Sequence, residues 1–248
     1  RKSSIDEFLY YANYASRQLE ELGGSALDKS SLEKEISELE KKVYILAKSL
    51  SEKRKSAAEK MSLDVEKILC SLGMKDTKFR VGLTEKEGNA VEQKCGPYGM
   101  DNIEFLISAN PGSPLNPLAK IASGGELSRV MLALKTILSD GDLAGTLVFD
   151  EIDTGIGGEV AVSVGSHMKK LAEKKQILCI THLASIAVYA DNQIKIQKGV
   201  EGNTTASNIF AVSGEERVKE IARMLSGDSD SSQSLEHAAA MLQKFGGR

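Results

Sequence analysis

A short apolar run that ends in two adjacent carboxylates constrains this chain more than any other stretch. Residues 147–149 read Leu-Val-Phe, and Asp150 and Glu151 follow directly. Such a run predicts a strand buried on both faces of a parallel sheet. Because ligands of open α/β sheets gather at the carboxyl ends of the strands, we expect the two acids where chemistry takes place.

The same pattern is typical of a Walker B motif. In that interpretation Asp150 holds Mg²⁺, usually through water, and Glu151 orients or activates the water that attacks a γ-phosphate. The pattern alone also allows a strand that merely ends in a solvated acidic turn. The choice between the two interpretations depends on the rest of the chain.

Composition indicates a helix-rich soluble protein. Of the 248 residues 41% are apolar and 27% are charged, and the net charge of −3 creates no global basic field for nucleic acid. The 3 cysteines lack C-x-x-C spacing, which argues against a zinc site and fits a reducing cytosol. Without a membrane-spanning apolar run or a signal peptide, we expect a cytoplasmic protein with no membrane partner. The start at Arg1 without Met predicts a fragment of a longer protein.

Heptad spacing dominates the N-terminal part of the chain. Apolar residues recur at alternating steps of three and four over about residues 5–22 and again over about 31–72, which predicts two coiled-coil helices in an arm at 1–75. A glycine pair at 23–24 predicts the stop between them. Part of the longer seam is then expected to pair with residues before the chain start or with a second chain. We interpret the basic bias over 41–60 as a solvated coiled-coil flank rather than a surface that tracks DNA phosphates.

A Ser-Gly-Gly turn at residues 123–125 begins another predicted helix. Ser123 is a good N-cap, and Gly124 and Gly125 leave the main-chain N–H groups sterically open. Free N–H groups at the positive end of a helix dipole form a ready anion site. Taken alone, the turn is better interpreted as an ordinary capped helix start, and only its place among the other motifs favours the anion site.

A second buried strand follows the two acids after a helical crossover. The glycine-rich turn at residues 153–158 leads into a helix at about 159–173, and residues 176–181 form the next apolar run. The resulting βαβ unit has a right-handed crossover, so His182 at the end of its second strand lies on the same sheet edge as Asp150. This placement favours a functional histidine over a structural one.

Together these motifs resemble, in their order, the head of an ABC-type ATPase, and the attached heptads narrow the resemblance to its SMC-like branch. The amino-acid sequence of three segments, residues 116–135, 149–158 and 181–187, resembles that of the RecN family of bacterial DNA repair proteins. The resemblance implies an α/β fold of the P-loop NTPase type. Residues 76–248 would form the C-terminal lobe of an ABC/SMC-type head, and residues 1–75 would belong to its coiled-coil arm.

The resemblance also assigns roles by position. Four residues form the signature motif, which contacts the γ-phosphate of ATP on the opposite head: Ser123, Gly124, Gly125 and Glu126. Asp150 would support Mg²⁺ and Glu151 would polarise the attacking water. Asp153 would lie in the D-loop that crosses the dimer interface, and His182 would be the switch histidine at the γ-phosphate.

One expected motif is absent. No Gly is followed by Lys, so the chain has no G-x-x-x-x-G-K-[ST] phosphate cradle. In SMC-like proteins that loop belongs to an N-terminal half, separated from these motifs by the coiled coil. We therefore expect that the chain alone neither binds nor hydrolyses ATP productively, and that its sheet presents an apolar face or edge where that half docks.

The resemblance predicts an ATP-driven machine of DNA double-strand break repair and recombination, associated with the nucleoid. ATP would clamp two heads into a homodimer, hydrolysis would release them, and the arms would transmit the change to DNA. The alternatives are another chromosome-maintenance ATPase of the same branch, and a non-catalytic coiled-coil scaffold. A long heptad arm argues against a subunit of an ABC transporter.

Overall fold

The computed structural model describes residues 5–121, 123–201, 204–229 and 231–246. The chain divides into two compact units, one of Arg1–Ala57 with Leu83–Ile103 and one of Ala58–Gly82 with Glu104–Arg248. No helix in the described part of the chain is long and apolar enough to cross a membrane.

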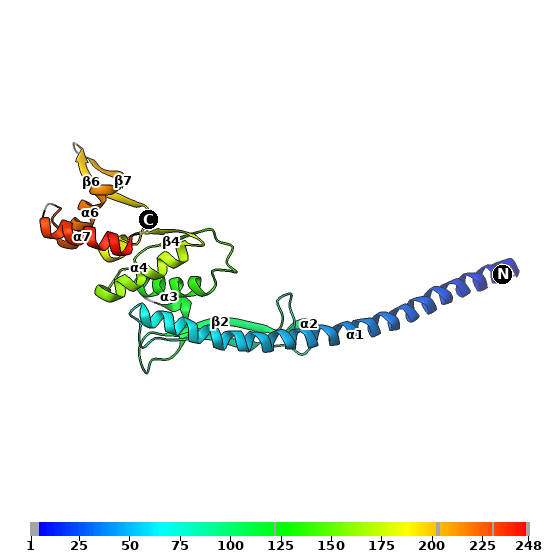
Figure 1. The fold of residues 1–248 in the computed structure, drawn as a ribbon. Coiled ribbons are helices and arrows are strands. Elements are labelled where there is room, and N and C mark those ends of the chain that lie inside the picture. The colour runs from blue at the N-terminus through cyan, green and yellow to red at the C-terminus, as the bar shows by residue number, and fades with distance from the viewer. Residues whose placement is uncertain (1–4, 122, 202–203, 230, 247–248) are drawn as a thin grey trace. The chain divides into compact units, whose positions relative to one another are not determined.

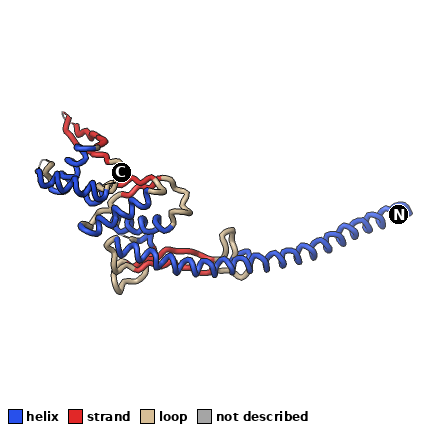
Figure 2. Tube along the Cα trace, viewed as in Figure 1, coloured by secondary structure: helices blue, strands red, loops and turns tan. Residues whose placement is uncertain are grey.

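A single helix, α1 (Ile5–Ser71), stands where the sequence predicts two (Figures 1 and 2). The prediction of a stop at Gly23 and Gly24 is wrong, because a glycine inside a helix costs only about 1 kcal/mol relative to alanine. Good helix formers on both sides continue the hydrogen-bond ladder through the pair. The apolar seam of the N-terminal and middle parts of this helix is exposed: Ile5, Phe8, Leu19, Leu32, Ile36, Leu39, Val43 and Leu46.

The first unit contains a buried polar cluster. Asp101, at the start of β2 (Asp101–Ser108), accepts hydrogen bonds from Ser51 Oγ at 2.6 Å and from Arg54 Nη1 at 2.9 Å. Its side chain is only 2% exposed. The cluster therefore pins β2 to α1 within this unit. A short helix, α2 (Val91–Lys94), lies in the connection between β1 (Lys78–Glu85) and β2.

The core of the second unit includes the C-terminal end of α1. Val65 and Leu69 are fully buried there, together with Leu72, which directly follows the helix, and Phe79 of β1. The two compact units therefore do not coincide with the predicted arm at 1–75 and lobe at 76–248. That division by function stays a prediction. A sheet of order β1-β2-β3 is completed by β3 (Asn116–Pro117), which runs antiparallel to β2.

The predicted βαβ unit is present. β4 (Thr146–Phe149) pairs in parallel with β5 (Gln176–Cys179), and α4 (Gly158–Ala172) connects them. The 3₁₀ turn η1 (Leu118–Lys120) and helix α3 (Gly124–Ile137) precede this unit in the chain. Figure 1 shows α3 and α4 beside β4.

The prediction that β4 is buried on both faces is wrong for this chain. Phe149 packs in the core, whereas Val148, Leu178 and Ile180 are 63%, 48% and 58% exposed. Because side chains alternate along a strand, the helices cover one face of the β4–β5 pair and leave the other open. This open face is apolar, as expected from the sequence.

The C-terminal elements form a smaller cluster. α5 (Ala184–Ala187) is followed by an antiparallel pair, β6 (Gln193–Glu201) and β7 (Thr204–Val212), and by helices α6 (Gly214–Ser226) and α7 (Ser232–Phe245). This pair is a sheet of its own and does not extend the β4–β5 sheet. A second apolar core, which includes the fully buried Ile221, joins α5 to α6 and α7.

Candidate functional site

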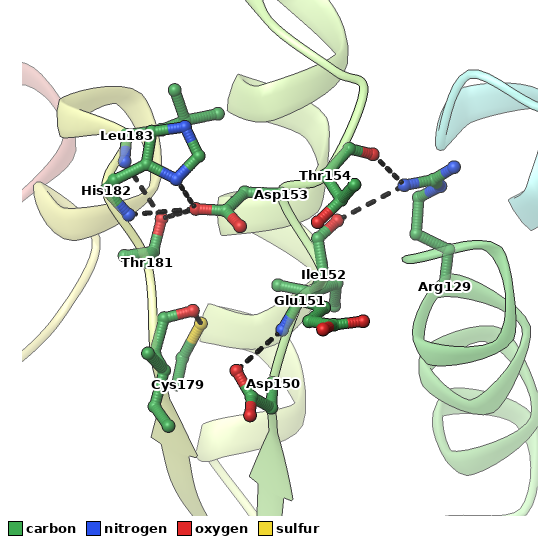
Figure 3. A network of polar contacts seen from close by, with 11 residues as sticks. Arg129, Asp150, Glu151, Ile152, Asp153, Thr154, Cys179, Thr181, His182 and Leu183 are labelled. Carbon is green, nitrogen blue, oxygen red and sulfur yellow. Dashed lines mark hydrogen bonds and ion pairs between the residues drawn. The ribbon is translucent and has the colours of Figure 1, made fainter. Parts of the chain in front are cut away.

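The predicted site residues meet at three segments of the second unit. The loop from Asp150 to Gly157 leaves β4, residues 181–183 leave β5, and the N-terminus of α3 lies against the first of these loops (Figure 3). Because Phe149 is in register with Cys179, both strands end at the same level. The parallel register thus places Asp150 and His182 on one sheet edge, as expected from the sequence.

Asp153 connects the two strand ends. Its Oδ2 accepts hydrogen bonds from Thr181 Oγ1 at 2.6 Å and from the main-chain N–H of His182 at 2.9 Å. Thr181 Oγ1 in turn accepts from the N–H of Leu183 at 3.0 Å. The Asp153 side chain is 6% exposed, so this carboxylate points into its own lobe.

The same oxygen orients the imidazole of His182. Nδ1 of His182 lies 3.0 Å from Asp153 Oδ2, while the histidine side chain is 76% exposed. A carboxylate at Nδ1 fixes the ring orientation and leaves Nε2 available to a group outside the lobe.

Asp150 and Glu151 are both exposed at the end of β4. Asp150 Oδ1 accepts a hydrogen bond from the N–H of Glu151 at 2.9 Å. Glu151 has a φ of 56°, the only non-glycine residue with a positive φ in the described part of the chain. Such a left-handed conformation costs roughly 1–2 kcal/mol in a residue with a Cβ, and strain of this kind concentrates at functional sites.

The donor chemistry at this edge fits a magnesium ion that arrives with its phosphates. Mg²⁺ takes one or two carboxylates together with several waters and phosphate oxygens, rather than a cage built only from protein groups. Asp150 offers an exposed carboxylate for such an ion, and Glu151 beside it is exposed as well.

The glycines of the signature segment allow α3 to approach the acid loop. A Cβ on Gly124 would meet the Glu151 carboxylate, which would have to move aside, and one on Gly125 would lie 3.0 Å from the main-chain oxygen of Glu151. Ser123 is the N-cap, as predicted, and its Oγ accepts from the N–H of Glu126 at 3.4 Å. The sequence suggests an anion site here, and the structure shows close packing as a second reason for the glycines.

Two further residues of α3 contact the acid loop, and sequence reasoning missed both. Ser128 Oγ donates to the main-chain oxygen of Asp150 at 2.7 Å, and Arg129 Nη1 donates to those of Ile152 and Thr154 at 3.3 and 3.0 Å. The sequence signal for both is their place about one turn after the signature glycines, beside the apolar stripe of the helix.

Cys179 lies beneath the site but is not a nucleophile. Burial, with the nearby charges of Asp153 and Asp150, raises the pKa of its thiol to about 12. The thiol is therefore protonated at neutral pH, whereas thiol nucleophiles need the thiolate. Cys179 is thus a small residue packed against the core.

The sequence of the chain is similar to those of known DNA repair proteins. No family model matches the chain. It is similar to the DNA repair protein RecN of Treponema pallidum, with 48% identity over 240 residues, which cover 97% of this chain and 42% of that protein. RecN of Mycobacterium tuberculosis is 37% identical over 255 residues, which cover 97% of this chain and 43% of that protein. RecN of Bacillus subtilis is 34% identical over 251 residues, which cover 98% of this chain and 44% of that protein.

Solved structures agree on the fold. The Smc head domain with a coiled coil and joint from Pyrococcus yayanosii matches with a TM-score of 0.53 and 19% identity, over 97% of this chain and 38% of that one. The fold is therefore that of the C-terminal lobe of an SMC-type head with a helical arm. The chain spans less than half the length of the relatives above, and with identities of 34–48% across nearly all of its own length it belongs to the RecN family.

Proposed function

We propose that this chain is the C-terminal part of an ATP-hydrolysing DNA repair protein. The observation that carries the proposal is the group at one sheet edge: two exposed acids after β4, and an oriented histidine after β5. The relatives are named DNA repair proteins, and these side chains are of the kind that phosphoryl-transfer sites require.

Each residue has a distinct task in this proposal. Asp150 would hold Mg²⁺ through water, and the bound ion would neutralise charge on the β- and γ-phosphates. Glu151 would orient the attacking water, and its exposed carboxylate can reach outward from the lobe. His182, with Nδ1 occupied by Asp153, would offer Nε2 to the γ-phosphate.

The missing phosphate cradle would come from a separate N-terminal half. The open apolar face of Val148, Leu178 and Ile180 supports this, because an exposed patch on a sheet that is covered only on its other face is a docking surface. The exposed seam of α1 would likewise pair with a second helix of the arm.

A second head and DNA complete the proposal. The N-terminus of α3 at Ser123 would contact the γ-phosphate held by the other head. Asp153 itself points inward, so contact of this loop across a head dimer would come from its neighbours, such as Thr154 and Gly155. A DNA partner would place the protein at the nucleoid.

The test is ATP hydrolysis by the chain alone and after mixing with the N-terminal half, each with Glu151 and with Glu151→Gln. We expect no turnover by the chain alone, turnover on mixing, and loss of that turnover in the substituted chain. Turnover by the chain alone would refute the split head. No turnover in a mixture whose halves are folded and bound to each other would favour a non-catalytic scaffold.

A further inference from the structure

Arg129 occupies an unusual place for a cation. It lies on α3, six residues after Ser123, and is 7% exposed. Its Nη1 donates to the main-chain oxygens of Ile152 and Thr154, at 3.3 and 3.0 Å. These two carbonyls flank Asp153, so the guanidinium holds the loop on both sides of that residue.

The loop carries its two sets of contacts on opposite sides. Figure 3 shows Arg129 approaching from α3 on one side, while the Asp153 side chain extends away from it toward Thr181 and His182. Ile152 between them is fully buried. Because the direction of a side chain follows the main chain that bears it, the clamp at Ile152 and Thr154 sets where the Asp153 carboxylate points.

Burial of the Arg129 guanidinium carries a desolvation cost. Burial lowers the pKa of Arg129, which the charge of Glu126 only partly offsets. Its buried Nε has no hydrogen-bond acceptor among the described residues. An apolar side chain of similar volume fills buried space without this desolvation cost, so packing alone does not account for an arginine at this position.

We propose that Arg129 is a positioning residue that couples the signature end of α3 to His182. Within the proposed ATPase, engagement of Ser123 and the signature glycines by a nucleotide moves or braces α3. Arg129 transmits this to the main chain around Asp153, and Asp153 transmits it to the imidazole. Arg129 itself touches no nucleotide. The identity of the ligand rests on the proposed function, whereas the contacts from Arg129 to His182 are those of the structure.

Arg217 is a matched control elsewhere in the same unit. On α6, its Nη2 donates to two main-chain oxygens, those of Ala187 and Ala190, at 3.3 and 2.7 Å, and burial lowers its pKa too. It thus resembles Arg129 in chemistry and clamps a segment that carries none of the site residues. Arg217→Met therefore reports the general cost of losing such a clamp.

The test compares Arg129→Met, Arg129→Lys and Arg217→Met in the full chain completed by the half that bears the phosphate cradle. The readouts are kcat and KM for ATP, and the ring ¹⁵N signals of His182, assigned with His182→Gln. We expect Arg129→Met to lower kcat on the order of tenfold with little change in KM, since misplaced groups act on the chemical step. The ¹⁵N signals of His182 should shift as well, Arg129→Lys should recover part of both effects, and Arg217→Met should change neither.

A double-mutant cycle with Asp153→Asn then tests the route. If Arg129 acts through Asp153, the two substitutions are non-additive in the His182 signals. Unchanged kcat and unchanged signals in a folded Arg129→Met protein, or full additivity in the cycle, would overturn the proposal. If Arg129→Met does not fold, Arg129→Lys replaces it in the same cycle. The ring signals need no turnover, so an inactive wild-type protein would count against the proposed function and leave this inference testable.

Discussion

Replacement of Asp153 by alanine is the most informative single perturbation of this lobe. One oxygen, Oδ2, accepts from Thr181 Oγ1 and from the N–H of His182, and also contacts the His182 ring. A hydrogen bond to a charged group contributes roughly 1.5–3 kcal/mol. The ring contact is mostly exposed and adds about 0–1 kcal/mol.

These contributions set the expected magnitude. Removal of a buried carboxylate also recovers part of its desolvation cost, which reduces the loss. We therefore expect Asp153→Ala to lower the free energy of unfolding of the lobe by about 2–4 kcal/mol. Asp153→Asn keeps one acceptor oxygen and loses the charge, so it should cost about half as much.

Urea-dependent hydrogen exchange, read by mass spectrometry on peptides from β4 and β5, measures this loss without interference from the long helix α1. The amides of residues 181–183 should lose protection first, because His182 donates directly to Asp153. Asp140→Ala is the control: this carboxylate is 86% exposed and its ion pair within the described residues is with Lys174, so no measurable change is expected. A loss below about 0.5 kcal/mol for Asp153→Ala, the range of ordinary surface changes, would refute the reasoning.

Two further predictions concern packing and pH. Gly125→Ala places a Cβ 3.0 Å from the Glu151 main-chain oxygen and should cost about 1–3 kcal/mol in urea unfolding, whereas Gly145→Ala meets nothing within 4 Å and should be neutral. Burial raises the pKa of Asp101, but hydrogen bonds from its serine and arginine partners outweigh this and hold it below the ordinary 3.8. The stability that Asp101 contributes is therefore present above that value and is lost as pH falls toward the lower folded pKa. When the free energy of unfolding is measured as a function of pH, Asp101→Asn should reduce its decline at acid pH. An unchanged decline would contradict the lowered pKa of Asp101.

The sequence alone determined the local pieces of this protein and their order. Strand and helix periods, turn glycines and the acids at residues 150–151 are encoded among near neighbours in the chain. Parallel pairing then places His182 on the same sheet edge as Asp150 by topology alone. The absence of a G-x-x-x-x-G-K-[ST] motif is read directly from the sequence, and an apolar face or edge on the sheet was expected from it.

Only the tertiary structure decided the contacts made across the chain. The clamp of Arg129 on Ile152 and Thr154 and the inward turn of Asp153 join residues more than twenty positions apart, so no local pattern encodes them. The one-sided burial of β4 was likewise decided by what packs against it. The continuity of α1 through Gly23 and Gly24 instead reflects the good helix formers on both sides of the pair. Periodicity says which residues share a face, but it does not say whether anything covers that face.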